Sequence, residues 1–299
     1  MPKVAVIGLG NMGRPMGLNL QKAGHDALGW DLAPDARERY GNEGGRIANG
    51  LEGALESADA LVTMIPAGPD VRAAYLGDDG ILARAAKNTL LIDSSTIDVD
   101  TSRAVNAEAT AAGFEMVDAP VSGAQPAAIA GTLTFMVGGT EAAFEKAKPI
   151  LAGMGANIIH AGPAGSGQAA KICNNMLAGT NMAVLCEALH LGQALGLDPL
   201  VMFDIISKSS GQSWALTGYC PVPGPVPAAA SNRDFEPGFA TALMNKDMTL
   251  SQQAAQSAGV ATPLAAQARA TYQLLVNSGY ADKDFSVIYD FLAGGKKAD

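Results

Sequence analysis

Three polar side chains stand together in an otherwise apolar stretch in the middle of the chain. Lys171, Asn174 and Asn175 are three and four residues apart, so in a helix they share one face. An amine and two carboxamides on a buried face need polar partners or a wet cavity, because burying them unpaired is costly. This face is the candidate site of proton-transfer chemistry. A structural alternative stays open, in which Lys171 extends to solvent and the asparagines bond to neighbouring backbone.

The element that must carry these residues is one long helix. From Gln168 onward about thirty residues lack proline and are dense in Ala, Leu and Met, which is typical of a helix buried on several sides. A helix over about residues 167–195 is roughly 40 Å long, enough to belong to two domains. The 299 residues are about twice a typical domain. We therefore expect a first domain over residues 1–163 and a second over 164–299 that includes this helix.

A glycine motif near the start of the chain predicts a dinucleotide site. A β-branched run at residues 3–7 is followed by G-x-G-x-x-G and then by a helical pattern, the setting in which this motif binds a pyrophosphate. The first glycine allows a tight turn, the second lets the backbone approach the phosphates and the third lets helix and strand pack closely. The helix N-terminus then faces the phosphates. The expected cofactor-binding residues here are Gly8, Gly10, Asn11, Met12 and Gly13.

Asp31 follows the second predicted strand, residues 26–30, and is 23 residues beyond Gly8. A carboxylate at this position accepts hydrogen bonds from the adenosine ribose hydroxyls and repels a 2′-phosphate. The sequence shows no arginine beside it, so NAD is expected as the cofactor in preference to NADP. The alternative role for Asp31 is that of an N-cap for a helix beginning near Ala33 and Pro34.

Strands and helices continue to alternate through the first half, which indicates a Rossmann-type, doubly wound α/β domain. Further strands are predicted at 60–64, 89–93, 114–118, 131–138 and 157–160, with helices at about 70–75, 97–112 and 140–152. Ligands bind beyond the carboxyl ends of strands in open parallel sheets. Four candidate residues follow such ends: Ile65, Pro66, Thr96 and Ser122.

The second half is predicted to be all-helical, with helices at about 199–207, 240–258, 263–277 and 285–292. Between the first two lies a segment of about thirty residues, 209–238, that contains Trp214, Tyr219 and prolines at 221, 223, 225 and 227. Loops of this length are usually functional or disordered. Two aromatic residues ahead of a proline-stiffened run favour an ordered lid.

Composition excludes several classes of protein. Apolar residues make up 48% and charged residues 16%, which suits a globular core and not a disordered chain. The net charge of −9, without a basic cluster, argues against nucleic acid or an anionic membrane as a partner. No apolar run reaches the roughly 18 residues of a membrane span, and the start lacks a signal-peptide pattern, so a cytoplasmic location is expected. Three scattered cysteines and three scattered histidines predict neither disulfides nor a metal site.

These motifs together resemble the β-hydroxyacid dehydrogenase family, and within it the 3-hydroxyisobutyrate dehydrogenases. The matching stretches are GLGNMGRPM (8–16), DAPVSG (118–123), GSGQAAKICNN (165–175) and NKD (245–247). The resemblance implies that Lys171 is the catalytic lysine, with Asn175 positioning it and the substrate. It further implies that Ser122 and Gly123 bind the substrate carboxylate and that Lys246 reaches over the cofactor.

Two further stretches bear on the substrate. The segment WALTGYCPVPG (214–224) looks like that of the hydroxyisobutyrate- and serine-oxidising members, which makes Trp214 and Tyr219 candidate substrate-binding residues. The family usually has glycine after the serine–glycine pair, whereas Ala124 and Gln125 follow Gly123 here. If position 124 needs a positive φ, alanine is costly and the loop differs in shape.

The expected function is NAD-dependent oxidation of a small 3-hydroxy acid, 3-hydroxyisobutyrate to methylmalonate semialdehyde, as in valine catabolism. Such a reaction needs a hydride acceptor, a base for the hydroxyl proton and donors for the carboxylate, and no metal. The alternatives are L-serine or tartronate semialdehyde as the substrate, or a non-catalytic dinucleotide-binding protein. The Ala-, Leu- and Met-rich helices of the second half also predict a homodimer or homotetramer.

Overall fold

The computed structural model describes residues 1–56 and 58–294 and divides the chain into two units, Met1–Lys171 and a second unit that begins at Ile172. The first unit is built on one sheet, whose first five strands are all parallel in the order β2-β1-β3-β4-β5. Their bounds are β1 (Lys3–Ile7), β2 (Asp26–Trp30), β3 (Ala60–Thr63), β4 (Leu90–Asp93) and β5 (Met116–Asp118).

Three more strands extend this sheet, and here its direction changes. They are β6 (Val121–Ser122), β7 (Leu133–Gly138) and β8 (Gly155–Gly162). Strand β7 runs antiparallel to β5 and β6, and β8 runs parallel to β7. The sequence did not reveal this reversal. The physical reason is the connection: only ten residues, which include the short helix α7 (Ala124–Ala130), join β6 to β7, and a parallel crossover needs a dozen or more.

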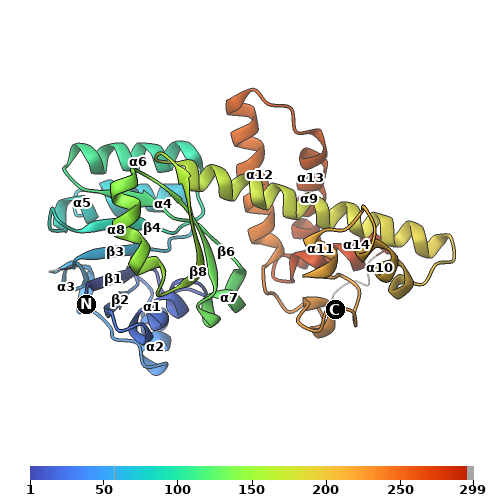
Figure 1. Cartoon of the computed structure of the whole chain (residues 1–299), viewed down its shortest axis with the longest axis horizontal. Coiled ribbons are helices and arrows are strands. Elements are labelled where there is room, and N and C mark those ends of the chain that lie inside the picture. The colour runs from blue at the N-terminus through green and yellow to red at the C-terminus, as the bar shows by residue number, and fades with distance from the viewer. Residues whose placement is uncertain (57, 295–299) are drawn as a thin grey trace. The chain divides into compact units, whose positions relative to one another are not determined.

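Helices cover both faces of the sheet, because alternate strand residues point to opposite sides. Val4 and Val6 join one core cluster with residues of four helices: α1 (Gly13–Lys22), α2 (Pro34–Asn42), α7 and α8 (Glu141–Leu151). Ala5 and Ile7 join a second cluster with residues of four others: α3 (Gly50–Leu55), α4 (Gly68–Leu76), α5 (Ile81–Arg84) and α6 (Val99–Ala111). Figure 1 shows α4, α5 and α6 together on one side of the strands. This arrangement confirms the Rossmann-type fold predicted from the alternating pattern.

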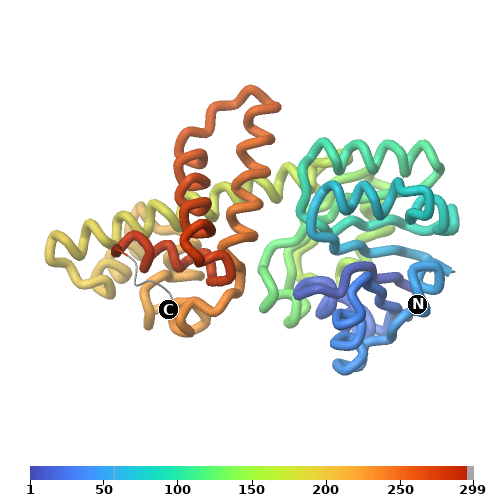
Figure 2. The backbone as a smooth tube through the Cα atoms, turned by 180° about the vertical axis from the view of Figure 1, so that it is seen from behind, coloured from blue at the N-terminus to red at the C-terminus, as the bar shows by residue number. Residues whose placement is uncertain are grey.

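The second unit is all-helical, as predicted. The long helix α9 (Ser166–Ala194) begins in the first unit and continues into the second. The other elements are α10 (Pro199–Ser207), α11 (Trp214–Thr217), η1 (Ala230–Arg233), α12 (Thr241–Ala258), α13 (Pro263–Leu275), η2 (Val276–Tyr280), η3 (Phe285–Val287) and α14 (Ile288–Leu292). Figure 2 shows α12 and α13 running side by side. Within the part of the chain that the structure describes, no helix is long and apolar enough to cross a membrane.

Candidate active site

The expected cofactor residues of the first unit follow strands at one edge of its sheet, whereas Lys246 belongs to the second unit. The last residues of β1, β2 and β3 are in register, since Ile7 pairs with both Trp30 and Thr63. Asp93 at the end of β4 pairs in turn with Thr63. The segments that follow these strands therefore emerge side by side, and they carry Gly8, Asp31, Ile65, Pro66 and Thr96. This is the edge at which open α/β sheets bind nucleotides.

The glycine loop has the geometry that a pyrophosphate requires. Gly8 has φ +94°, and a Cβ there would lie 2.2 Å from the carbonyl oxygen of Met64. A Cβ on Gly13 would lie 1.8 Å from the carbonyl oxygen of Gly8. Gly10, in contrast, faces open space with no heavy atom within 4 Å of the Cβ position, as a backbone approached by a ligand should. These residues fit the dinucleotide phosphates, which would meet the N-terminus of α1.

Asp31 is held in place by the glycine loop itself. Its Oδ2 accepts the N–H of Leu9 at 2.7 Å and its Oδ1 accepts the N–H of Ala33 at 2.8 Å. The N-cap of α2 is Ala33, so the alternative role of Asp31 as that cap is wrong. No arginine is adjacent to Asp31 in the sequence, but in the structure Arg37 donates to the backbone carbonyls of Asp31 and Leu32. Helix α2 carries Arg37 back over the loop, which sequence adjacency does not show.

A buried polar network fixes the ends of β3 and β4. Thr63 Oγ1 donates to Asp93 Oδ1 at 2.8 Å, and the Tyr75 hydroxyl lies 2.9 Å from the same Thr63 oxygen. Ser95 Oγ accepts the N–H of Ile65 at 2.8 Å. Burial raises the pKa of the Asp93 carboxyl above its ordinary value, and hydrogen bonds from Ser95 and Thr63 lower it in part. The loops that carry the expected cofactor residues are thus bonded to each other.

The candidate carboxylate loop turns sharply after Ser122. Gly123 has φ +124° and Ala124 has φ +55°, so position 124 does adopt the left-handed conformation considered from the sequence. An L-residue there costs about 1–2 kcal/mol relative to the right-handed region. Helix α7 begins at Ala124, directly after the turn. The loop of this chain is therefore strained at Ala124.

The start of α9 is bonded to the sheet by two buried side chains. The Asp118 carboxylate accepts the N–H groups of Gly165 and Gln168 at 2.7 and 2.9 Å. Burial raises the pKa of Asp118, and these N–H groups lower it in part. Gln168 is wholly buried; its Nε2 donates to the Ser95 carbonyl at 2.7 Å and its Oε1 accepts the N–H of Ile97 at 3.1 Å. Thr96 lies between these two bonded residues.

Lys171 follows one turn later on α9 and is only 8% exposed. The structural alternative, in which Lys171 extends to solvent, is therefore wrong. One turn further on, Asn175 is 5% exposed, and its Nδ2 donates to Asp247 Oδ2 at 2.5 Å. Asn174 Nδ2 donates to Asn175 Oδ1 at 3.0 Å. Lys246 Nζ lies 3.9 Å from Asp247 Oδ1. The second unit thus joins the asparagines to the NKD segment through one buried carboxylate.

The long segment 209–238 is ordered. It contains α11 and η1, and internal bonds such as Ser231 Oγ to the Cys220 carbonyl at 2.7 Å hold it together. Trp214, which is 55% exposed, stacks on Tyr219 with ring centroids 5.1 Å apart. The Tyr219 hydroxyl donates to Asp284 Oδ2 at 2.7 Å, so its polar atom is already engaged. A lid role for this segment stays a prediction.

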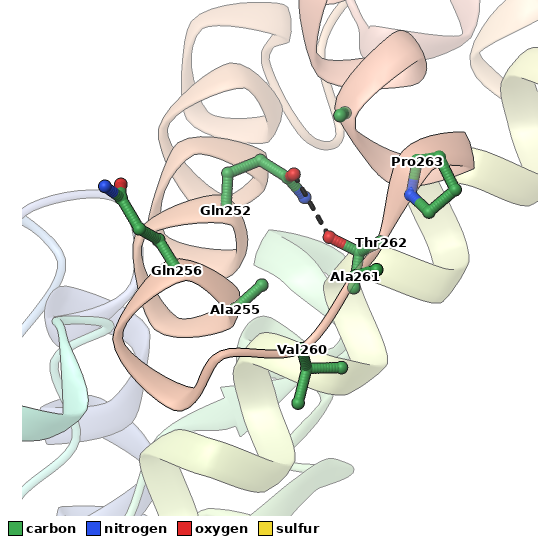
Figure 3. Close-up of a pocket in the computed structure, with 8 residues that line it drawn as sticks. Gln252, Ala255, Gln256, Val260, Ala261, Thr262 and Pro263 are labelled. Atoms are coloured by element: carbon green, nitrogen blue, oxygen red, sulfur yellow. Dashed lines mark hydrogen bonds between the residues drawn. The ribbon is translucent and has the colours of Figure 1, made fainter.

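A pocket at the turn between α12 and α13 is not a second candidate. Figure 3 shows its lining, where Gln252 is hydrogen-bonded to Thr262. The remaining lining residues are Ala255, Gln256, Val260, Ala261, Pro263 and Ala266. None of these side chains can take up or release a proton near neutral pH, and none belongs to the motifs above. The pocket therefore offers no group for acid–base chemistry.

Several polar residues around the candidate site were missed at the sequence level. Asp247 could have been predicted from the sequence, because it completes the NKD stretch beside Lys246. Gln168 lies three residues before Lys171 and so shares its helix face, a signal that was available. Asp118 opens the DAPVSG stretch, but the N–H groups that it binds are 47 and 50 residues away. Asp284 binds Ser286 two residues on, but its bond to Tyr219 spans 65 residues, which no local pattern reveals.

Comparison with known proteins identifies both parts of the chain. Residues 3–162 match the family model described as the NAD binding domain of 6-phosphogluconate dehydrogenase. Residues 165–292 match the model described as NAD-binding of NADP-dependent 3-hydroxyisobutyrate dehydrogenase. The two matches lie on either side of residues 163 and 164, where the sequence predicts the domain boundary.

Curated relatives match over almost the full length. The chain is 46% identical to the NAD-dependent L-serine dehydrogenase of Pseudomonas aeruginosa over 96% of this chain and 97% of that protein. It is also 46% identical to the 3-hydroxyisobutyrate dehydrogenase of the same organism, over 98% of this chain and 99% of that protein. Among solved structures, the Mycobacterium tuberculosis 3-hydroxyisobutyrate dehydrogenase with L-serine aligns with a TM-score of 0.92 and 44% identity, covering 98% of this chain and 99% of that one.

These matches confirm the resemblance seen in the motifs, the enzyme class and NAD as the cofactor. Two relatives that are each 46% identical to the chain are named for different substrates, so the comparisons support a hydroxy acid as the substrate without identifying which one. The chain belongs to the 3-hydroxyisobutyrate dehydrogenase family of NAD-dependent oxidoreductases that act on an alcohol CH–OH group.

Proposed function

We propose that this enzyme oxidises 3-hydroxyisobutyrate to methylmalonate semialdehyde, with Lys171 as the general acid/base. The observation that carries the proposal is the burial of Lys171 on α9, one turn before an asparagine that is itself bonded to a buried carboxylate. The reaction removes a hydride from the carbinol carbon and a proton from its hydroxyl. NAD, held by the glycine loop and Asp31, would supply the hydride acceptor. The protein must therefore supply the proton acceptor and hold the substrate.

Lys171 takes the proton as a neutral amine and returns it as an ammonium in the reverse direction. Asn175 donates through Nδ2 to Asp247, and this bond leaves Oδ1 as its acceptor. We assign to Asn175 the orientation of the Lys171 amine and the substrate hydroxyl, with Asp247 orienting Asn175 through its bond to Nδ2.

The substrate carboxylate is assigned to Ser122 and Gly123. A hydroxyl and a backbone N–H are suitable charge-assisted donors for a carboxylate, and the turn at Gly123 and Ala124 exposes the backbone at the end of β6. Trp214 and Tyr219 are proposed as apolar contacts of the substrate. Since the Tyr219 hydroxyl donates to Asp284, Tyr219 would act through its ring.

L-Serine is the second candidate substrate, and tartronate semialdehyde, reduced in the reverse direction, is a third. One relative at 46% identity is named for L-serine, and the aligned Mycobacterium tuberculosis structure contains it. L-Serine is also a 3-hydroxy acid, so the same lysine and carboxylate donors would serve. It differs in carrying an ammonium in place of a methyl group.

A substrate panel tests the assignment. We expect 3-hydroxyisobutyrate with NAD to give the highest kcat/KM among 3-hydroxyisobutyrate, L-serine and glycerate, each assayed with NAD and with NADP. A preference for L-serine of about tenfold or more, which is about 1.4 kcal/mol of transition-state binding, would transfer the assignment to L-serine. An absence of turnover with every substrate would support the alternative of a non-catalytic dinucleotide-binding protein.

We also propose that the second unit forms a homodimer or homotetramer. On α9, Leu177, Val184 and Leu191 recur every seven residues and are each more than half exposed. Helix α10 is strongly apolar, yet none of its residues is buried; Leu200 and Ile205 are about half exposed. A second copy is the partner that we expect for these stripes, because closed symmetric homo-oligomers are common among soluble enzymes. Light scattering should give a mass of two or four chains, and a mass near 30.4 kDa would contradict the proposal.

A further inference from the structure

The side chain of Gln168 makes a pair of contacts that the chemistry above does not use. It is 0% exposed, and both ends of its amide are engaged with one short stretch of backbone. Nε2 donates to the carbonyl of Ser95 at 2.7 Å, and Oε1 accepts the N–H of Ile97 at 3.1 Å. The amide thus binds the residue before Thr96 and the residue after it, as a neighbouring strand would.

These two hydrogen bonds fix the position of Thr96 in the loop after β4. The segment between Asp93 and α6 has no regular structure, so the backbone hydrogen bonds of a helix or strand do not fix its conformation. Ser95 is also bonded through its hydroxyl to the N–H of Ile65. Gln168 and Ser95 together therefore hold the two segments that carry the expected cofactor contacts Ile65, Pro66 and Thr96.

The same side chain belongs to the helix of the proposed base. Gln168 and Lys171 are three residues apart on α9 and share one face. The first turn of α9 is fixed to the sheet by the Asp118 carboxylate, which accepts the Gln168 N–H. The backbone of Gln168 is therefore held by β5, and its side chain is held by the loop after β4. Any displacement of Lys171 along the helix axis has to break these bonds.

We propose that Gln168 is a positioning residue for hydride transfer: it holds the Thr96 loop and the helix turn that carries Lys171 in one rigid frame. The inference rests on the proposed role of Lys171. While both hydrogen bonds of the Gln168 side chain are made, the cofactor-binding loop and Lys171 cannot move independently. A displacement of 1 Å can cost about a hundredfold in rate, so a single bridging side chain is enough to matter.

Two substitutions test whether the two hydrogen bonds of the Gln168 side chain are needed, and not its packing alone. Gln168→Met has similar length and removes both hydrogen bonds. Gln168→Glu keeps the shape, but an ionised carboxylate cannot donate to the Ser95 carbonyl, whereas a protonated carboxyl can both donate and accept. Gln253→Met, on the exposed side of α12, is the matched control for the loss of an amide.

For Gln168→Met we expect kcat to fall by at least about tenfold, which is within the range for a misplaced reacting group. The dissociation constant for NAD, from quenching of tryptophan fluorescence, should rise by a smaller factor than kcat falls, because the bond between Ser95 and Ile65 still joins the two cofactor-binding segments. With substrate deuterated at C3, the isotope effect on kcat should be at least that of wild type, because hydride transfer is the step that is slowed. Gln253→Met should match wild type throughout.

The pH profile of Gln168→Glu gives a second readout that packing alone would not change. Burial favours the neutral carboxyl, so the ratio of kcat for this variant to kcat for wild type should rise as pH falls. A flat or falling ratio would overturn the proposal, as would Gln168→Met with a lowered melting temperature and kcat within twofold of wild type. Lys171→Ala, assayed alongside, separates the two claims. If it remains active, the proposed function fails; if it is inactive and Gln168→Met is not, only the bridging role fails.

Discussion

Asp284 is the residue whose replacement tests the structure of the second unit most sharply. Its carboxylate is wholly buried and accepts five hydrogen bonds. Oδ2 receives the Tyr219 hydroxyl at 2.7 Å and the N–H groups of Gly238 and Phe239 at 3.0 Å each. Oδ1 receives the N–H and the hydroxyl of Ser286 at 3.0 and 2.7 Å. One side chain thus connects Tyr219, inside the 209–238 segment, and Gly238, at its end, to Ser286 in the last helical elements.

The substitution Asp284→Asn should be costly despite its small change in shape. Every partner on both oxygens is a donor, so the new NH₂ group faces donors in either orientation. The least costly choice turns it toward Ser286, whose hydroxyl can rotate and accept while its N–H is left unpaired. One unsatisfied buried N–H together with weaker remaining bonds predicts a loss of about 2–4 kcal/mol in the free energy of unfolding.

Urea unfolding followed by Trp214 fluorescence measures this loss, because Trp214 stacks on Tyr219 and so reports on the affected segment. A Trp30→Phe background removes the signal of the first unit. The exposed neighbour Asp282 gives the control, and Asp282→Asn should change the free energy of unfolding by less than about 0.5 kcal/mol. A loss below about 1 kcal/mol for Asp284→Asn would refute the reasoning, since that is the net value of one ordinary hydrogen bond.

Three further substitutions test the first unit. Burial raises the pKa of Asp93 in the folded state, so its stabilising contribution is complete below the unfolded pKa of about 4 and is lost as pH rises through the folded pKa. The free energy of unfolding of Asp93→Asn relative to wild type should therefore increase over that pH range. A pH-independent difference in urea titrations would contradict this. Asp31→Ala should raise kcat/KM with NADP relative to NAD, because the carboxylate that repels a 2′-phosphate is gone and Arg37 lies beside it; an unchanged ratio would count against Asp31. Ser122→Ala should mainly raise KM for the hydroxy acid, by the loss of a hydrogen bond to a charged group of about 1.5–3 kcal/mol; a loss confined to kcat would argue for a different role.

Local patterns in the sequence were enough to predict most of the longer strands and helices, but not the short elements β6, α3, α5 and α7. The strands at residues 3–7 and 26–30 and the helix at 199–207 have the predicted bounds, because hydrophobic periodicity and Pro or Gly punctuation define them locally. The reversal at β7 was not predicted. Its direction depends on strand pairing in three dimensions, and a short apolar run has the same appearance in a parallel and an antiparallel sheet.

The candidate site was predictable where a motif carries the chemistry and not where tertiary contacts do. Gly8 and Gly13 have the close backbone contacts that their motif implies, and Lys171 is buried as its apolar helix suggested. Arg37 reaches Asp31 through a helical turn. Asp284 meets Tyr219 across 65 residues of chain. Such pairings follow from the packing of whole elements, which periodicity within one segment does not encode.

The measurement that tests the central claim most directly is the turnover of Lys171→Ala on the best substrate of the panel. If Lys171 transfers the proton, kcat should fall by at least about a hundredfold, the lower end of a positioned acid–base contribution. The NAD dissociation constant, from tryptophan quenching, should stay within about threefold of wild type, since losing a proton-transfer group alone removes no cofactor contact. The exposed lysine variant Lys148→Ala should retain full activity. Near-normal turnover of Lys171→Ala would show that the lysine is structural and would contradict the mechanism.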